Sequence, residues 1–231
     1  ISAQSPEEAV SAAELYIDEG FEGFKIKAGI NTELDLEIIK SVSEISKDIF
    51  IVVDANQSWD KEKTIKISKL LSHANVRYIE QPLPANNILD YAKIVHKCSI
   101  PIALDESVFT LQDLINHIEL KAINALVLKV SRSAGLYNAF RIGKLALNNG
   151  IELLGGGLTE SMLGLLGSAH LFASLGIKTP VDLNGMQFLA DDLFVTENIT
   201  EHKISKTCIE LYHSAGIGMQ PDEKALNDFR A

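Results

Sequence analysis

The amino-acid sequence predicts an α/β fold, a closed barrel of the (β/α)8 type built from parallel strands. Short apolar runs alternate with amphipathic helical segments along almost the whole chain, as in folds made of repeated βα units. Ionisable residues stand at the C-terminal ends of five successive apolar runs. The 231 residues are 46% hydrophobic and 23% charged, which is typical of a globular protein.

The chain opens with a short strand-like stub and then a helix whose start carries capping signals. Ser5 suits an N-cap, Pro6 suits the first helical position, and the helix is expected to stop near Gly20. Beyond it, helical patterns fill the gaps between strand-like runs. The expected strands are 1–3, 23–27, 49–53, 76–79, 101–104, 125–130, 151–154 and 181–183.

Charged residues at the strand ends favour a closed barrel over an open sheet. Lys27, Asp54, Glu80, Asp105 and Lys129 follow one another at intervals of 27, 26, 25 and 24 residues, close to one βα unit each. In a barrel these ends surround one mouth, where the active sites of this fold lie. In an open sheet they would spread along an edge. Any single Asp here could instead be a helix N-cap or a turn residue.

Composition excludes several classes of protein. The net charge of −10 argues against a nucleic-acid binder, and no apolar run is long enough to predict a membrane span. The first residues do not show the basic segment followed by an apolar stretch that is typical of a signal peptide. Cys98 and Cys208 lie 110 residues apart and indicate incidental thiols in a reducing compartment, so we expect a cytoplasmic protein with neither nucleic-acid nor membrane partners.

Three carboxylates from consecutive strands predict a metal site. Asp54, Glu80 and Asp105 offer only oxygen ligands, with no His or Cys at equivalent positions. Such a set suits a hard divalent cation, and we expect one Mg²⁺ per active site. Lys25 and Lys27 are two residues apart on a strand, so their side chains should share a face.

Lysines on both sides of these acids predict proton-transfer chemistry. Lys27 precedes the three carboxylates and Lys129 follows them. A lysine acts as a base when burial and neighbouring cations lower its pKa. Beside a cation that holds a substrate carboxylate, it could remove an α-proton and form an enediolate.

Five ordered motifs resemble those of the muconate-lactonizing subgroup of the enolase superfamily. They are Phe24-Lys25-Ile26-Lys27, Val53-Asp54-Ala55-Asn56-Gln57, Ile79-Glu80-Gln81-Pro82, Leu104-Asp105-Glu106-Ser107 and Leu128-Lys129-Val130. The resemblance implies that Asp54, Glu80 and Asp105 are metal ligands, Lys27 and Lys129 the acid/base pair, and Lys25 a charge partner of the substrate carboxylate. Asn56 and Glu106 would support the ligands, or they are merely a turn amide and a surface acid.

The eighth expected strand bears on which reaction is catalysed. The subgroup includes dipeptide epimerases, muconate cycloisomerases and o-succinylbenzoate synthases. Asp182-Leu183-Asn184 is similar to the Asp-x-Asp motif with which dipeptide epimerases hold the substrate α-ammonium, except that the second Asp is Asn184. Epimerisation of a dipeptide is therefore the leading hypothesis, although Asp182 could simply cap its strand.

A glycine-rich loop before the seventh expected helix is the other candidate substrate contact. Gly155-Gly156-Gly157 precedes Thr159, Glu160 and Ser161, and the segment is similar to the family loop ending in Glu-Ser that lines the substrate pocket. The alternative is a tight turn with Thr159 as N-cap.

The resemblance also bears on domain organisation and partners. Residues 1–231 are expected to be the barrel domain, with 191–231 packing on an N-terminal capping domain of the same polypeptide that this chain lacks. We expect a homo-oligomer acting on a small carboxylate, most simply a dipeptide. The alternatives are a cycloisomerase or o-succinylbenzoate synthase type lyase, a Schiff-base aldolase using Lys129, and a binding domain without activity.

Overall fold

The computed structural model describes residues 1–183, 185–188, 203–211, 216–217, 223 and 227. Its main sheet has six strands in the order β1-β2-β3-β4-β5-β6, and β1 to β5 pair in parallel. The strands are β1 (Gly23–Lys27), β2 (Phe50–Asp54), β3 (Val76–Glu80), β4 (Ile102–Leu104), β5 (Ala125–Leu128) and β6 (Glu152–Gly155). Neighbours in the sheet are thus neighbours in sequence, as expected for repeated βα units.

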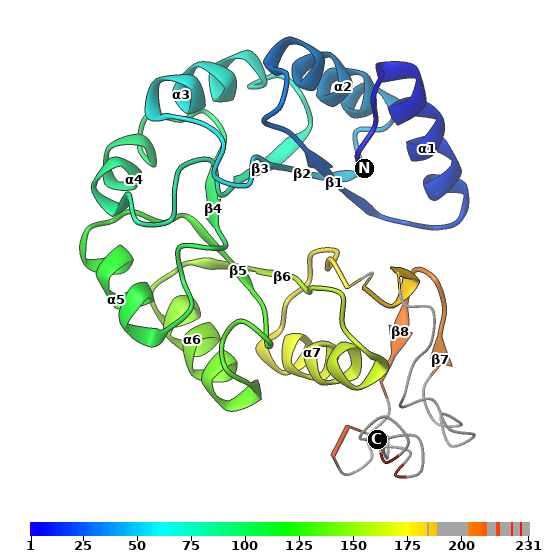
Figure 1. The fold of residues 1–231 in the computed structure, drawn as a ribbon, viewed down its shortest axis with the longest axis vertical. Helices are drawn as coiled ribbons and strands as arrows, with labels where there is room; N and C mark the ends of the chain where they lie inside the picture. Colours follow the sequence, from blue (N-terminus) through cyan, green and yellow to red (C-terminus); the bar gives the residue numbers. More distant parts are fainter. Residues whose placement is uncertain (184, 189–202, 212–215, 218–222, 224–226, 228–231) are drawn as a thin grey trace. The chain divides into compact units, whose positions relative to one another are not determined.

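A helix precedes β1 and follows each strand of the sheet. The helices are α1 (Pro6–Asp18), α2 (Thr32–Ile45), α3 (Lys61–Leu70), α4 (Ile88–Ile94), α5 (Leu111–Glu119), α6 (Leu136–Asn148) and α7 (Met162–Leu175). Helices α1 to α5 lie along the outer side of strands β1 to β5 (Figure 1). Ser5 caps α1 by accepting from the N–H of Glu8, as the sequence predicts.

The chain forms two compact units. Unit 1 comprises residues 1–127 and 145–154 and holds most of the main sheet together with α1 to α5. Unit 2 comprises 128–144 and the described part of 155–231. Besides α7, unit 2 contains the 3-10 helix η1 (Gly185–Phe188) and an antiparallel pair of short strands, β7 (Lys203–Ile204) and β8 (Ile209–Glu210).

Both faces of the sheet in unit 1 are buried. One buried cluster contains side chains from five different strands: Val52, Tyr78, Ala103, Ala125, Val127 and Leu154. Alternate residues such as Ile51 and Val53 point to the opposite face and are also fully buried. Parallel sheets covered on both faces need nearly continuous apolar strands, which is why these strands were recognisable in the sequence.

The structure differs from the sequence prediction at the flanks. Residues 1–3 are not a strand, although the carbonyl of Ile1 accepts from the N–H of Lys27. Residues 181–183 form only an isolated parallel bridge between Asp182 and Gly156. Strand β5 ends at Leu128 rather than at residue 130. These segments are too short or too sparsely paired for a full ladder of hydrogen bonds.

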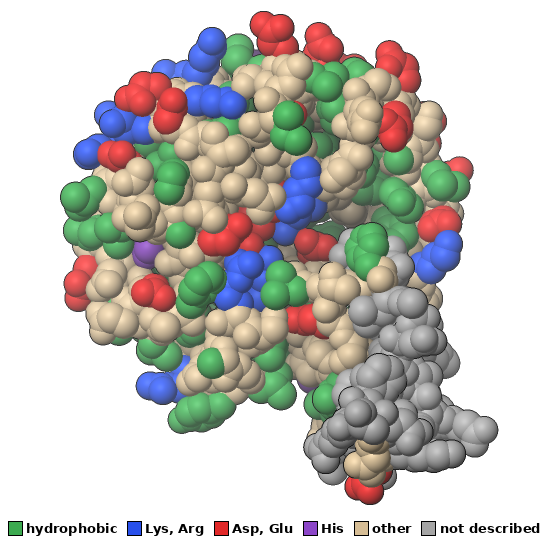
Figure 2. All heavy atoms as spheres, viewed as in Figure 1, with side chains coloured by type: hydrophobic (Ala, Val, Ile, Leu, Met, Phe, Trp, Pro, Cys, Tyr) green, Lys and Arg blue, Asp and Glu red, His purple; other side chains and the backbone are tan. Residues whose placement is uncertain are grey.

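Surface charge is divided among the outer helices of unit 1. Acidic side chains gather over α1 and α2 and basic side chains over α3 (Figure 2). Within the described residues, no helix combines the length and the apolar character needed to cross a bilayer.

Candidate active site

The C-terminal ends of β1 to β3 align charged residues in one row of unit 1. Lys27 of β1 is the register partner of Asp54 on β2, and Asp54 is the partner of Glu80 on β3. Asp105 directly follows β4, whose Ala103 pairs with Glu80. The structure thus brings the three predicted ligands and Lys27 to the same end of the sheet, where the strands have their C-termini.

Two ion pairs link the lysines of β1 to these carboxylates. Lys25 Nζ lies 2.9 Å from Glu80 Oε1, and Lys27 Nζ lies 2.6 Å from Asp54 Oδ2. Both lysines therefore point to one face, as their two-residue spacing requires. The side chain of Lys27 is 47% exposed and that of Lys25 is 16% exposed, so Lys27 is the more accessible ammonium group.

The three carboxylates are buried close together, so their negative charges repel one another. Asp54, Glu80 and Asp105 are at most 2% exposed. Burial raises the pKa of Glu80 to about 7; Lys25 opposes this rise, and the neighbouring Asp54 and Asp105 add to it. A cation held among these groups would offset their repulsion.

The donor set fits a hard divalent cation such as Mg²⁺. All three groups provide carboxylate oxygens, and Oε2 of neighbouring Glu106 is a buried oxygen with no hydrogen-bond partner. Among the described residues, no three acidic, His or Cys side chains converge as a formed metal site, and lysine ammonium groups contact two of these carboxylates. Asp54, Glu80 and Asp105 are the residues that would hold the ion.

Asn56 and Glu106 extend the charged row by hydrogen bonds. Lys27 donates to Asn56 Oδ1 at 2.8 Å, and Asn56 Nδ2 donates to Glu106 Oε1 at 3.3 Å. The backbone N–H of Asn56 also donates to Asp54 Oδ1 at 3.0 Å. Asn56 therefore contacts both Lys27 and its carboxylate partner, which fixes the direction of the ammonium group.

Sequence reasoning missed Gln81. This fully buried side chain accepts hydrogen bonds from the backbone N–H groups of Asp105 and Ser107. Its backbone has a φ of 38°, in the left-handed region that non-glycine residues rarely occupy. Gln81 stands in the motif Ile79-Glu80-Gln81-Pro82, but the sequence predicted no role for it.

The remaining predicted site residues belong to unit 2. Lys129 directly follows β5 and is 7% exposed. Ser131, another residue that the sequence did not reveal, donates to Glu160 Oε1 at 2.7 Å. Ser161 is the N-cap residue of α7 without a side-chain capping bond, so Thr159 is not the N-cap.

Asp182 and Asn184 complete the unit 2 residues. The N–H of Asp182 donates to the carbonyl of Gly155 at 2.9 Å, which ties the segment to the end of β6. Asn184 lies outside the described residues, as does most of 191–231.

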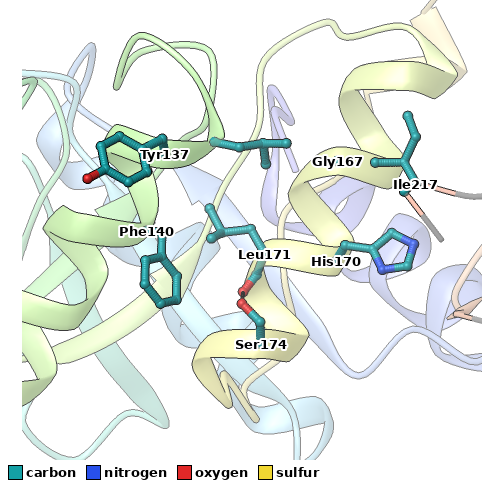
Figure 3. Close-up of a pocket in the computed structure, with 9 residues that line it drawn as sticks. Tyr137, Phe140, Gly167, His170, Leu171, Ser174 and Ile217 are labelled. Carbon is teal, nitrogen blue, oxygen red and sulfur yellow. Dashed lines mark hydrogen bonds between the residues drawn. The ribbon is translucent and has the colours of Figure 1, made fainter. Parts of the chain in front are cut away.

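A hollow of about 410 Å³ in unit 2 lies between α6 and α7. Tyr137 and Phe140 of α6 and His170, Leu171 and Ser174 of α7 line it (Figure 3). Its described lining residues include no Lys, Arg, Asp or Glu, so they do not offer the chemistry predicted for the active site.

Comparison with known proteins decides the family. A family model described as "Enolase C-terminal domain-like" matches residues 8–225. This chain belongs to that family. The assignment confirms the predicted membership of the enolase superfamily.

The related sequences are epimerases and racemases. The chain is 30% identical to an N-succinyl-L-Arg/Lys racemase of Bacillus cereus over 99% of its own length and 61% of the relative's. It is 36% identical to a D-Ala-D/L-Ala epimerase of Cytophaga hutchinsonii over 74% of its own length and 47% of the relative's. The chain therefore spans about half to three fifths of these relatives.

Solved structures confirm the predicted α/β barrel fold. A substrate-liganded L-Ala-D/L-Glu epimerase from Bacillus subtilis matches with a TM-score of 0.85 and 26% identity, over 94% of this chain and 60% of that chain. A Cytophaga hutchinsonii dipeptide epimerase, complexed with Mg and the dipeptide D-Ala-L-Val, matches with a TM-score of 0.86 and 29% identity, over 98% of this chain and 61% of that one. A muconate cycloisomerase from Pseudomonas fluorescens, at 24% identity, matches in fold with a TM-score of 0.87, over 98% of this chain and 63% of that chain.

Proposed function

We propose that this chain carries the active site of a Mg²⁺-dependent epimerase that removes the proton α to a carboxylate, with a dipeptide as substrate. The observation that carries the proposal is the row of buried carboxylates paired with lysines at the ends of β1, β2 and β3. When bound, Mg²⁺ would stabilise the negative charge that develops on the substrate carboxylate as the α-proton leaves. The relatives that epimerise dipeptides support the same reaction type.

In this proposal Lys27 is one acid/base group. It is the more exposed lysine of the row, and Asn56 and Asp54 fix the direction of its ammonium group. Before it can accept a proton from the substrate, its amine must be in the neutral form. Lys25, half-buried and paired with Glu80, supplies positive charge for the substrate carboxylate.

Lys129 is proposed as the second acid/base group on the strength of its sequence position directly after β5 and of the motif it completes. One lysine would remove the proton from one epimer, and the other would deliver a proton to the opposite face of the enediolate. Asp182 would hold the substrate ammonium, with Glu160 and Ser161 as further substrate contacts.

Hydrogen exchange in D2O tests the two-lysine mechanism. With Lys129→Ala, the epimer whose α-hydrogen faces Lys27 should still exchange that hydrogen without inverting, and Lys27→Ala should show the reverse preference. Lys93→Ala, which removes an exposed ion pair with Asp90, is the matched control and should interconvert both epimers normally. If either Lys27→Ala or Lys129→Ala still interconverts the epimers at a rate near wild type, the mechanism is refuted.

Racemisation of N-acylated amino acids is a second candidate function, because a relative matched over 99% of this chain is an N-succinyl-L-Arg/Lys racemase. Acylation removes the substrate ammonium, so Asp182 discriminates between the two. If a dipeptide is the substrate, Asp182→Ala should lower kcat/KM for dipeptides at least about tenfold, as expected for a charge-assisted contact. The racemase would be favoured if Asp182→Ala turned over dipeptides as wild type does and if wild type turned over N-succinyl amino acids faster than dipeptides.

A further inference from the structure

Gln81 is a buried residue of unit 1 with no role in the proposed proton transfer. It directly follows Glu80, and its side chain is fully buried. Its Oε1 accepts from the backbone N–H of Asp105 at 2.8 Å and from that of Ser107 at 3.2 Å. One side-chain oxygen therefore holds the turn that presents Asp105.

The other end of the carboxamide is also anchored. Nε2 of Gln81 donates to the Tyr91 hydroxyl at 2.8 Å and to Ser107 Oγ at 2.7 Å, with the carbonyl of Leu83 at 3.1 Å. The hydroxyl of Tyr91 donates in turn to the Leu83 carbonyl at 2.6 Å. Because every polar atom in this buried network has a partner, the carboxamide has little freedom to turn.

The backbone of Gln81 is held as firmly as its side chain. Its φ of 38° lies in the left-handed region, and such conformations persist in non-glycine residues where the surroundings over-determine them, often at functional sites. Its N–H donates to the carbonyl of Ala103 at 2.8 Å, and its carbonyl accepts from the N–H of Gln57 at 2.7 Å. The unusual conformation directs the carboxamide at the turn after β4.

We propose that Gln81 is a positioning residue that sets the spacing between the proposed metal ligands Glu80 and Asp105. It is bonded covalently to Glu80 and by hydrogen bonds to the backbone of Asp105, so it couples the two carboxylates across neighbouring strands. The inference rests on the proposed Mg²⁺ centre. Removing a group that orients metal ligands typically weakens metal binding about 10–100-fold.

Calorimetric titration of the full chain with MgCl2 tests this role. Gln81→Met keeps the length of the side chain but removes its bonds to Asp105 and Ser107. Tyr91→Phe is the matched control, because it removes a buried hydroxyl of the same network and leaves the contacts of Oε1 in place. Both variants should lower the midpoint of thermal unfolding. Only Gln81→Met should raise the Kd for Mg²⁺ about tenfold or more, while Tyr91→Phe stays within about threefold of wild type.

The possible outcomes separate this inference from the function on which it rests. A folded Gln81→Met variant with the wild-type Kd, or an equal loss of affinity in Tyr91→Phe, overturns the positioning role but not the metal centre. A wild-type chain that binds no Mg²⁺ overturns both. If Gln81→Met does not fold, Gln81→Asn withdraws the carboxamide by one methylene and should also raise the Kd about tenfold; a wild-type Kd there overturns the inference.

Discussion

Glu80 is buried among charges of both signs. Its carboxylate contacts Lys25, and Asp54 and Asp105 lie close enough to raise its pKa further. A carboxylate in such a place is costly to keep charged without cations nearby, since burial deprives it of water. The same arrangement makes it a strong ligand for a divalent ion, because binding the ion offsets the repulsion within the site.

Replacing Glu80 with Gln should weaken Mg²⁺ binding and activity together. The substitution keeps the shape of the side chain but removes one negative charge from an oxygen-only site, so we expect the Kd for Mg²⁺ to rise at least about tenfold. Calorimetry and an epimerisation assay would measure the two effects. The control is Glu62→Gln on α3, whose side chain is 78% exposed and which should change neither. Normal turnover by Glu80→Gln after exhaustive chelation would contradict the assignment.

His117 should make stability depend on pH. Burial lowers its pKa from the usual 6.5, its Nδ1 lies 2.9 Å from the carbonyl of Asp113, and its Nε2 is buried with no hydrogen-bond partner. Below pH 6.5 the unfolded chain binds a proton at this residue and the folded chain does not. The free energy of unfolding should therefore decrease as the pH falls from 6.5 toward the lower pKa of the folded state, and should not depend on this group above 6.5.

Urea unfolding at several pH values would measure this contribution. Relative to wild type, His117→Leu should lose less stability as the pH falls from 7.5 to 5.5, because the contribution of this imidazole is removed. His96→Leu, at an exposed position after α4, is the matched control and should leave the dependence as in wild type. An identical dependence in His117→Leu and wild type would assign it to other groups.

At the residue scale, the sequence predicted those site residues that can be recognised from their neighbours in the chain. The carboxylates and lysines could be found because each stands at the end of an apolar run. The motif contained Gln81 but not its role, because that role depends on partners 24 and 26 residues away and on a left-handed backbone conformation. Ser131 was missed for the same reason, since it contacts Glu160 29 residues away.

At the scale of elements, the strands of the main sheet were predictable and the flanking ones were not. Strands β2 to β6 consist mostly of buried apolar residues, and β1 alternates buried apolar residues with lysines, so each gives a recognisable pattern in the sequence. The segments 1–3 and 181–183 have similar apolar residues but few pairing partners, and strand formation depends on those partners. The start of α1 was predictable because its capping residue Ser5 precedes it, whereas the N-cap of α7 is Ser161 and not Thr159.

Helix α5 provides a test of capping at the scale of one element. Thr110 accepts from the N–H of Asp113, and the Asp113 side chain accepts in return from the N–H of Thr110. Thr110→Ala removes the hydroxyl that accepts from the N–H of Asp113 and leaves that N–H without its capping bond, so the free energy of unfolding should fall by about 1 kcal/mol. Asn87, the N-cap residue of α4, makes no side-chain capping bond, so Asn87→Ala should cost clearly less in the same urea-unfolding measurement. Equal costs at the two positions would show that the capping bonds of Thr110 contribute little.

At the scale of the whole molecule, two compact units share one chain. All three proposed ligands lie in unit 1, at the ends of strands that neighbour one another in both sequence and sheet. An ion bound there would therefore tie together elements from residue 50 to residue 105. A ligand that binds only the folded state stabilises it by mass action.

Thermal unfolding with and without MgCl2 tests this coupling between metal and fold. At a Mg²⁺ concentration 100 times the Kd, the folded state should gain about 2.7 kcal/mol, so the unfolding midpoint should rise, and excess EDTA should abolish the rise. In Glu80→Gln the rise should be much smaller at the same Mg²⁺ concentration, because Glu80 is one of the three buried carboxylates. In Glu62→Gln the rise should match wild type, because Glu62 is exposed and lies outside that group. Equal rises in all three proteins would assign the stabilisation to weak binding at surface acids, which the net charge of −10 makes available, and would remove Glu80 from the metal site.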